Sequence, residues 1–403
     1  MIKNLPDSTL TSELDALRDK NLLRTLPSAL DRPGALARRA GKDWLQFSAN
    51  DYLGLATHPV VIEGACQAAR DAGCSATGSR LLSGNLSLHE TLERELARLK
   101  KTETALLFNS GFAANTGMLS ALAGEVDLLV CDKLNHASLI DGARQSGAQV
   151  RYYRHGHLDR ARELLTAEGR DGRAYRRKFL VTDGVFSMDG DIVDLPEALK
   201  LCDESGARLI LDDAHATGVI GPTGRGTFEH FGLHPDPRTI IMGTLGKALG
   251  GFGAFVACDA ATRALLINHA RPFVFSTALP PPVLGAALAA LSVLRDEPQR
   301  LNLLRANIAH LRMVLRVAGL DVEDGYTPIV PIPVGDAGQA LQLARDLEAR
   351  GILALAVRPP TVPIGGSRLR VTVSADHTFS QIDQLAQALG NLWADRDNRG
   401  DAP

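Results

Sequence analysis

The stretch Leu209-Ile210-Leu211-Asp212-Asp213-Ala214-His215 decides the fold of this chain, because an apolar strand pattern in it ends directly on charged residues. About one α/β unit later, Thr239-Ile240-Ile241-Met242 leads in the same way into Gly243-Thr244-Leu245-Gly246-Lys247-Ala248. Apolar strands that alternate with helical patterns are typical of a mostly parallel sheet with helices on both faces. Such sheets bind ligands at the carboxyl ends of their strands, where we expect Asp212, His215 and Lys247 to lie.

The same alternation extends along much of the chain. Strand-like apolar runs occur at 105–108, 127–131, 149–153, 179–182, 208–212, 239–242 and 252–258. A long helical pattern over 284–318, interrupted near Pro298, leads to a second region that predicts strands at 329–334, 352–357 and 368–373. We therefore predict a large α/β domain followed by a smaller α+β domain.

The two ends of the chain complete this division. Residues 1–50 combine an amphipathic helix pattern, two prolines at turns and a strand-like 44–47, which indicates an N-terminal arm. The predicted domains are the arm 1–50, the large domain 51–290, the small domain 291–393 and a polar, flexible tail 394–403.

Composition indicates a soluble cytoplasmic protein that acts on a small molecule. The chain has 403 residues, is 45% hydrophobic and 22% charged, and carries a net charge of -2 with the two signs interspersed. No basic stripe indicates nucleic acid. The five cysteines are scattered without a C-x-x-C pair, the first 20 residues lack an export signal, and the longest uncharged stretch is broken by three prolines, so we expect no membrane span.

Lys247 and Asp212 suggest pyridoxal 5'-phosphate as the cofactor. A lysine that is desolvated can form a Schiff base with the aldehyde, and a buried carboxylate can pair with the protonated pyridine nitrogen. Each residue also has a structural interpretation: a solvated lysine after a strand and an aspartate that caps a helix. A Walker loop is excluded because Ile241 and Ala248 occupy the positions of its first glycine and its Ser/Thr.

Three further loops follow predicted strands and could complete such a site. Asn109 to Asn115 places Gly111 before a helical pattern, where backbone amides can bind phosphate. His136 could stack on a planar ring, and Ser187 follows the next strand but one along the chain. Each of these signals alone is weak, but their common place at strand ends favours one ligand site.

Four segments resemble the α-oxoamine synthases, which are fold-type I pyridoxal-phosphate enzymes that condense an amino acid with an acyl thioester. The resemblance covers nearly the whole chain, and its most specific matches are Phe47 to Leu55, Ser79 to Asn85, Asp212 to Gly218 and Arg358 to Pro363. The last match belongs to the substrate-selective C-terminal region of that family.

The resemblance implies a role for each matching residue. Lys247 would hold the cofactor's aldehyde and move protons, Asp212 would pair with the pyridine nitrogen and His136 would stack on the ring. For the rest of the cofactor, the resemblance implies that the phenolic oxygen is contacted by His215 and Ser187, and the phosphate by Gly111, Phe112 and Thr244. For the substrates, it implies that the amino-acid carboxylate is bound by Asn50 and Arg370, and the acyl substrate by Arg24 and Thr361. It also implies a homodimer with the site at its interface, where the partner's phosphate is contacted by Ser276 and Thr277.

The resemblance further implies the reaction, an acyl transfer in biotin biosynthesis. L-alanine would condense with pimeloyl-CoA or pimeloyl-ACP, with loss of carbon dioxide and the thiol, to give 8-amino-7-oxononanoate. Thr182-Asp183-Gly184 and the segment 243–251 are also similar to glycine C-acetyltransferase, which is the alternative. A metal-dependent hydrolase that uses Asp212 and His215 is the alternative from another class.

Overall fold

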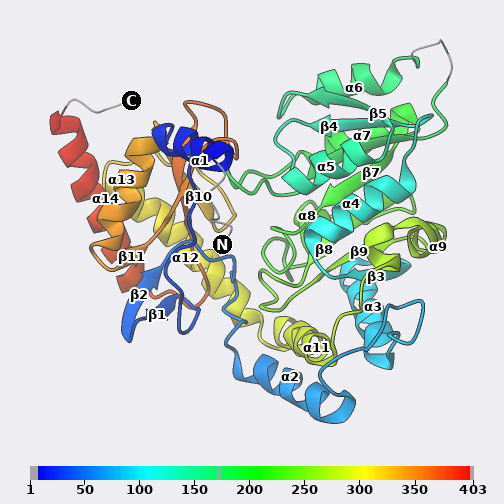
Figure 1. Cartoon of the computed structure of the whole chain (residues 1–403), viewed down its shortest axis with the longest axis horizontal. Helices are drawn as coiled ribbons and strands as arrows, with labels where there is room; N and C mark the ends of the chain where they lie inside the picture. Colours follow the sequence, from blue (N-terminus) through cyan, green and yellow to red (C-terminus); the bar gives the residue numbers. More distant parts are fainter. Residues whose placement is uncertain (1–7, 170–171, 173, 400–403) are drawn as a thin grey trace, which may run out of the picture.

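The computed structural model describes residues 8–169, 172 and 174–399, and these form two parts that lie side by side (Figure 1). The larger part is a helix-covered sheet, and the smaller part combines the C-terminal region with the N-terminal arm. The predicted limits of the domains remain a prediction.

The large part is built on a seven-stranded sheet with the strand order β3-β9-β8-β7-β6-β4-β5. All neighbours in it are parallel except β9, which is antiparallel to β3 and β8. The predicted α/β fold with a mostly parallel sheet is thus confirmed. The strands are β3 (Thr104–Phe108), β4 (Leu128–Asp132), β5 (Gln149–Tyr153), β6 (Lys178–Asp183), β7 (Arg208–Asp212), β8 (Thr239–Thr244) and β9 (Ala254–Cys258).

Helices cover both faces of this sheet because successive side chains of each strand point to opposite faces. Ile210 lies in one apolar cluster with α4 (Gly111–Leu122), α5 (Ala137–Gln145), α9 (Ala260–His269) and α10 (Arg271–Val274). Leu209 and Leu211 lie in the other, which extends into the small part and in the large part includes residues of α3 (Ser87–Lys100), α6 (Leu158–Thr166), α7 (Leu195–Ser205), α8 (Thr227–His230) and α11 (Pro281–Asp296). By the same alternation, Asp212 faces α4 and α5.

The small part contains the antiparallel sheet β10-β13-β12, formed by β10 (Ile329–Gly335), β13 (Ser367–Thr372) and β12 (Leu355–Val357). Its helices are α12 (Pro298–Val317), α13 (Ala337–Glu348) and α14 (Phe379–Arg399), and α2 (Pro59–Ala72) packs on α11 of the large part. Helices α11 and α12 confirm the predicted helical tract with its break near Pro298.

One predicted strand is wrong as a single element. The stretch 352–357 is divided into β11 (Ile352–Leu353) and β12, which belong to different sheets. The arm strands β1 (Leu36–Arg39) and β2 (Lys42–Gln46) form a sheet of their own, and β11 pairs with β2 in it. The division follows from this pairing, because one short segment serves two sheets, and it attaches the arm to the small part.

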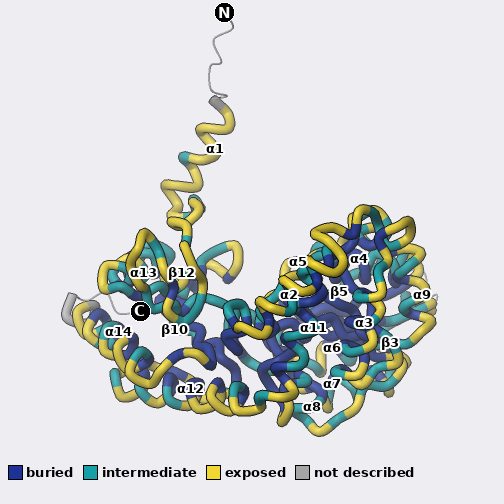
Figure 2. The backbone as a smooth tube through the Cα atoms, turned by 90° about the horizontal axis from the view of Figure 1, so that it is seen from below, coloured by how far each residue is buried: buried dark blue, intermediate teal, exposed yellow. Residues whose placement is uncertain are grey.

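The ends of the described chain are helical. Helix α1 (Ser8–Asp19) projects from the body in Figure 2 and leaves Leu10, Leu14 and Leu17 exposed. Residues 394–399 of the predicted flexible tail continue α14, and residues 400–403 lie outside the described range. Of the helices described, none is long and apolar enough to cross a membrane.

Candidate active site

Asp212 ends β7 as a buried carboxylate that forms no ion pair with the described residues. Its Oδ2 accepts a hydrogen bond from Asn115 Nδ2 at 2.7 Å, and its Oδ1 accepts from the Ala214 amide at 3.0 Å. No ion pair joins it to any of the described residues. A buried carboxylate is stable as an anion only beside a cation or strong donors. Asp212 therefore fits the protonated nitrogen of pyridoxal phosphate, with Asn115 fixing its orientation.

Lys247 lies in the turn between β8 and β9. Burial lowers the pKa of its amine to about 8, against the opposing effect of Asp212. The turn itself requires glycine at 250, where φ is +62° and a Cβ would lie 2.3 Å from the Ala56 amide nitrogen. A pKa of about 8 leaves roughly one amine in ten neutral at pH 7, so Lys247 can attack an aldehyde at neutral pH.

His215 is buried beside this pair and is held neutral. Burial, with help from Lys247 and Arg370, lowers its pKa well below the ordinary value. Its Nδ1 lies 2.8 Å from the hydroxyl of buried Tyr52, whose pKa is raised by burial. When Tyr52 donates to Nδ1, the Nε2 of a neutral imidazole carries the proton and can donate to a phenolic oxygen. Tyr52 was not singled out from the sequence, although it lies inside the matching segment 47–55.

His136 lines the neighbouring cleft as the N-cap of α5. Its Nδ1 accepts a hydrogen bond from the Ser138 amide at 3.3 Å, and its own amide donates to Asp183 Oδ2 at 2.8 Å. Burial and Lys247 lower its pKa while Asp212 opposes them, which favours a neutral ring suited to stacking. Burial and the nearby Asp212 raise the pKa of Asp183 well above its usual range.

Arg370 of β13 brings a buried cation from the small part to the same place. Its Nη1 and Nη2 each lie 3.2 Å from Asn50 Oδ1, Nη2 also donates to Tyr52, and Nε donates to the Ser187 carbonyl at 2.6 Å. All of these acceptors are neutral, and no carboxylate of the described residues forms an ion pair with it. A buried guanidinium without a counter-ion fits a carboxylate ligand.

The predicted phosphate site lies at the start of α4. Ser110 caps the helix by accepting from the Ala113 amide, so Gly111 and Phe112 provide the first-turn amides. A Cβ at Gly111 would meet only Met242 Cε at 3.7 Å, which leaves room for a ligand. The Thr244 hydroxyl, by contrast, already donates to the Gly253 carbonyl at 3.1 Å and would have to turn to reach a phosphate.

Thr277 is an exposed residue whose carbonyl accepts a hydrogen bond from Asn109 Nδ2 at 2.9 Å. The single chain places it next to the loop that leads into α4, with Ser276 before it. Its predicted reach to a partner's phosphate remains a prediction.

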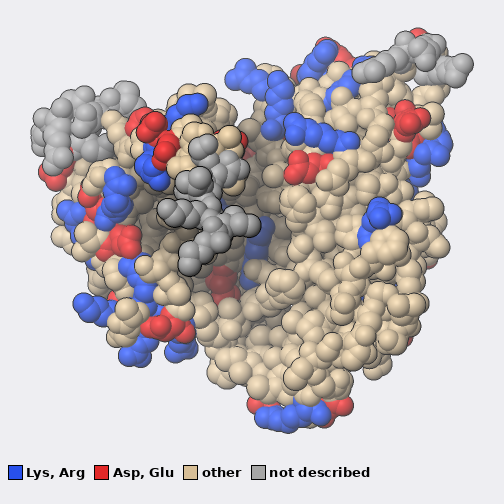
Figure 3. All heavy atoms as spheres, viewed as in Figure 1, with Lys and Arg blue, Asp and Glu red and all other residues tan. Residues whose placement is uncertain are grey.

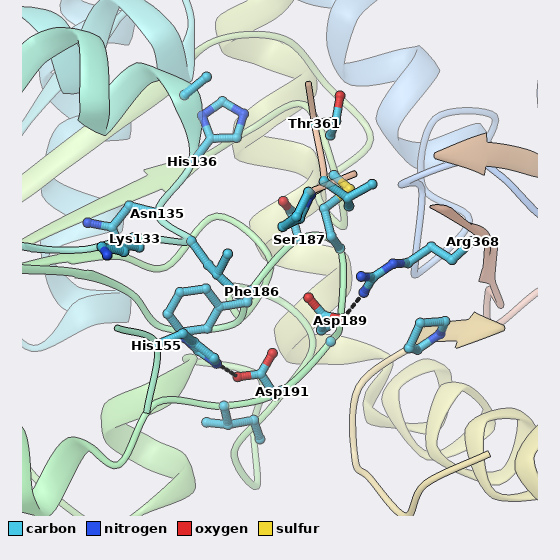
Figure 4. A pocket seen from close by; sticks show the side chains of 18 of the residues that line it. Lys133, Asn135, His136, His155, Phe186, Ser187, Asp189, Asp191, Thr361 and Arg368 are labelled. Carbon is cyan, nitrogen blue, oxygen red and sulfur yellow. Dashed lines mark hydrogen bonds and ion pairs between the residues drawn. The ribbon is translucent and has the colours of Figure 1, made fainter. Parts of the chain in front are cut away.

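A cleft of about 1440 Å³ opens between the two parts, and Figure 3 shows the hollow. Its wall includes His136 and Ser187 from the large part and Thr361 from the small part (Figure 4). Arg24 of the arm lies in the same wall and donates to Thr361 Oγ1 at 3.2 Å. Lys247 and Asp212 are not part of this wall. The cleft therefore brings together the predicted acyl-binding pair, Arg24 and Thr361, with the predicted cofactor residues His136 and Ser187.

The geometry does not favour the hydrolase alternative. Asp213 points to the face of the sheet opposite Asp212, where its Oδ2 accepts from Lys100 Nζ at 2.6 Å and Oδ1 from Thr227. Within the described ranges, no group of three His, Cys, Asp or Glu residues could hold a metal ion. Asp212 and His215 thus lack the further ligands that such a centre needs.

Comparisons with known proteins agree with this geometry. The family model of class I and II aminotransferases matches residues 42–389. The 8-amino-7-oxononanoate synthase of Cellvibrio japonicus is 46% identical over 360 residues, 89% of each chain. That of Trichlorobacter lovleyi is 45% identical over 387 residues, 96% of this chain and 97% of the relative.

Solved structures give the same result. The serine palmitoyltransferase of S. paucimobilis with PLP bound superimposes with a TM-score of 0.86 at 29% identity, and covers 95% of this chain and 96% of its own. The 8-amino-7-oxononanoate synthase of Francisella tularensis has a TM-score of 0.74 at 30% identity, over 87% of this chain and 98% of its own.

Fold and site together define the class of fold-type I pyridoxal-phosphate enzymes. The chain belongs to the family of class I and II aminotransferases and, within it, to the group of 8-amino-7-oxononanoate synthases. The resemblance drawn from the sequence, including the cofactor that it implied, is confirmed. The roles of single residues remain predictions.

Proposed function

We propose that this chain condenses L-alanine with a pimeloyl thioester to give 8-amino-7-oxononanoate, carbon dioxide and the free thiol. One observation carries the proposal: Lys247, with a pKa lowered to about 8, interacts electrostatically with buried Asp212 at the same sheet edge and with buried Arg370 from the small part. The relatives that bear the name of this synthase are 42 to 46% identical to the chain over most of its length. Glycine C-acetyltransferase, the sequence alternative, rests on the similarity of two short segments, and none of the relatives reported above bears that name.

Some residues at the sheet edge would hold the cofactor, and Lys247 would also transfer a proton. When bound, pyridoxal phosphate supplies an aldehyde for the amino group and a ring that accepts electrons from the α-carbon. Asp212 would hold the protonated pyridine nitrogen, and neutral His215 would donate to the phenolic oxygen. The Lys247 amine would accept and return the α-proton at Nζ, which its lowered pKa permits near neutral pH.

The two substrates contact different residues of the site. Arg370 and Asn50 bind the alanine carboxylate, because their joint cluster offers N–H donors and, among the described residues, no ion-paired carboxylate competes. Arg24 and Thr361 contact the acyl group in the cleft, whose wall they share. The carrier of the thioester is CoA or an acyl carrier protein.

We propose further that two copies of the chain form a homodimer with the site at the interface. Large apolar side chains are exposed on the single chain, among them Phe112 at the start of α4, Phe275 two residues before Thr277, and Leu82 and Phe252. Thr277 would reach the partner's phosphate. Light scattering that gives one 43.0 kDa chain instead of two would contradict this arrangement.

The function is tested by presenting the cofactor-loaded protein with four substrate pairs. L-alanine or glycine is combined with pimeloyl-CoA or acetyl-CoA, and the products are identified by mass. We expect alanine with pimeloyl-CoA to give the highest kcat/KM and the mass of 8-amino-7-oxononanoate. A preference for glycine with acetyl-CoA would reassign the chain to the acetyltransferase, and no product with any pair would contradict both assignments.

Arg370→Gln is predicted to raise KM for L-alanine about 100-fold or more, since one charge-assisted contact to a carboxylate contributes about 3 kcal/mol. KM for pimeloyl-CoA should change little. Initial rates at varied alanine concentration measure this effect. Arg368→Gln is the matched control, because Arg368 lies on the same strand and pairs with Asp189. Equal changes of both KM values in the Arg370 variant would contradict a specific carboxylate role.

A further inference from the structure

His155 stands between two loops that border the predicted cofactor, and no role has been assigned to it so far. It follows β5 and lines the cleft. Its Nδ1 lies 3.1 Å from Asp132 Oδ2, and its Nε2 lies 2.8 Å from Asp191 Oδ2. Figure 4 shows the His155 ring and its contact to Asp191. Both ring nitrogens therefore face carboxylate oxygens.

This arrangement requires a protonated imidazole. A neutral ring has one N–H and could satisfy only one carboxylate, whereas the imidazolium donates from both nitrogens. Hydrogen bonds to Asp132 and Asp191 accordingly raise the pKa of His155 to about 10. The Phe186 ring packs edge-on against it, with the ring centres 4.2 Å apart. His155 is thus a fixed cation throughout the neutral range.

The first carboxylate belongs to the loop that carries His136. Asp132 ends β4, is buried, and accepts the Leu134 amide at its other oxygen at 2.8 Å. Asn135 continues this loop and donates to the Val181 carbonyl at 2.9 Å. Since His136 follows directly, the position of Asp132 sets where the His136 ring lies.

The second carboxylate belongs to the loop that carries Ser187. The Phe186 amide donates to the Asp191 carbonyl at 3.0 Å, and the Gly190 amide donates back to the Phe186 carbonyl at 2.8 Å, which closes the loop on itself. The Ser187 carbonyl at its tip accepts from Arg370. The position of Asp191 therefore influences both Ser187 and the arginine proposed to bind alanine.

We propose that His155 is a positioning residue: its imidazolium ties Asp132 to Asp191 and so sets the spacing of the His136 loop and the Ser187 loop across the cofactor ring. The inference rests on the proposed function, because it concerns the same site. His155 does not touch the reacting atoms in this arrangement. It acts through the two loops, and the His136 loop is also joined to β6 by the hydrogen bonds of Asn135 to Val181 and of the His136 amide to Asp183.

The test uses His155→Gln, which keeps a polar side chain but cannot donate to both carboxylates. His310→Gln is the matched control, since His310 forms a single ion pair with Asp383 at 2.7 Å in the small part. Asp191→Asn removes the same contact at a more exposed position, where a substitution disturbs the fold less. It therefore tests the proposal even if His155→Gln does not fold. Each protein is equilibrated with a series of concentrations of free pyridoxal phosphate, and the visible circular dichroism of the bound cofactor is recorded at each concentration.

We expect His155→Gln to weaken pyridoxal-phosphate binding about tenfold, equivalent to one charge-assisted hydrogen bond. The visible dichroism should change, KM for alanine should rise, and His310→Gln should match the wild type. The contact of His155 with Asp132 and Asp191 acts as one unit. The double variant with Asp191→Asn should therefore bind the cofactor no more weakly than His155→Gln alone.

Two results would overturn the proposal: cofactor affinity and dichroism in His155→Gln equal to the wild type, or additive losses in the double variant. A wild-type protein that binds no pyridoxal phosphate would instead refute the proposed function itself. The two failures are therefore distinguishable in one titration series.

Discussion

Replacing Lys247 by alanine is expected to abolish product formation, a loss of roughly four orders of magnitude or more, because covalent attachment and proton transfer both depend on its amine. The fold should remain intact, since Lys247 lies in a turn whose shape depends on backbone bonds such as Gly251 N to the Leu245 carbonyl at 2.8 Å. Single-turnover product formation measures the loss, and far-ultraviolet circular dichroism checks the fold.

Lys133→Ala provides the control for charge and cleft position, because Lys133 is an exposed lysine in the wall of the same cleft. It should keep near wild-type turnover. A small primary amine added to the Lys247→Ala protein should restore part of the activity, as expected when a missing general base is replaced from solution. Wild-type turnover by the Lys247→Ala protein would refute the proposed mechanism.

Asp212→Asn is expected to lower kcat by a factor of several hundred to several thousand, which corresponds to the roughly 3 to 5 kcal/mol of a broken buried charge pair. The variant should still fold, because the Oδ1 atom of Asn115 lacks a hydrogen-bond partner and its amide can turn to face the new side chain. Turnover and the visible spectrum of the loaded protein measure the effect.

Asp194→Asn distinguishes this role from ordinary helix capping. Asp194 also lies before a helix, where it caps α7 by accepting from the Glu197 amide at 3.1 Å. Asparagine caps as well as aspartate, so this variant should be nearly silent. If Asp212→Asn were equally silent, Asp212 would be a capping residue and its pairing with the pyridine nitrogen would be refuted.

Much of the fold could be predicted from the chain because its strands are continuous apolar runs. All seven predicted strands of the large part occur, from β3 to β9. Their order in the sheet and the reversed direction of β9 were not predicted, since an apolar run shows that a strand is buried but not which neighbour it pairs with. The division of 352–357 between two sheets was missed for the same reason.

For the site as well, single residues could be predicted from the sequence, but contacts between distant residues could not. Lys247, Asp212 and His215 were predicted because each follows a strand and carries a functional group that the cofactor needs. Tyr52, Asn115 and His155 were missed as participants, because each acts on a partner far away in the chain, such as Asn115 on Asp212. Their place inside matching or strand-end segments was the only sequence signal.

The sequence by itself determined the class of fold, the cofactor chemistry and the family, because these depend on apolar periodicity and on short local motifs. Only the tertiary structure decided that Arg370 reaches Asn50 and Ser187 from another sheet, and that one histidine faces two carboxylates. The physical reason is that charge states and donor directions depend on burial and on neighbours distant in sequence.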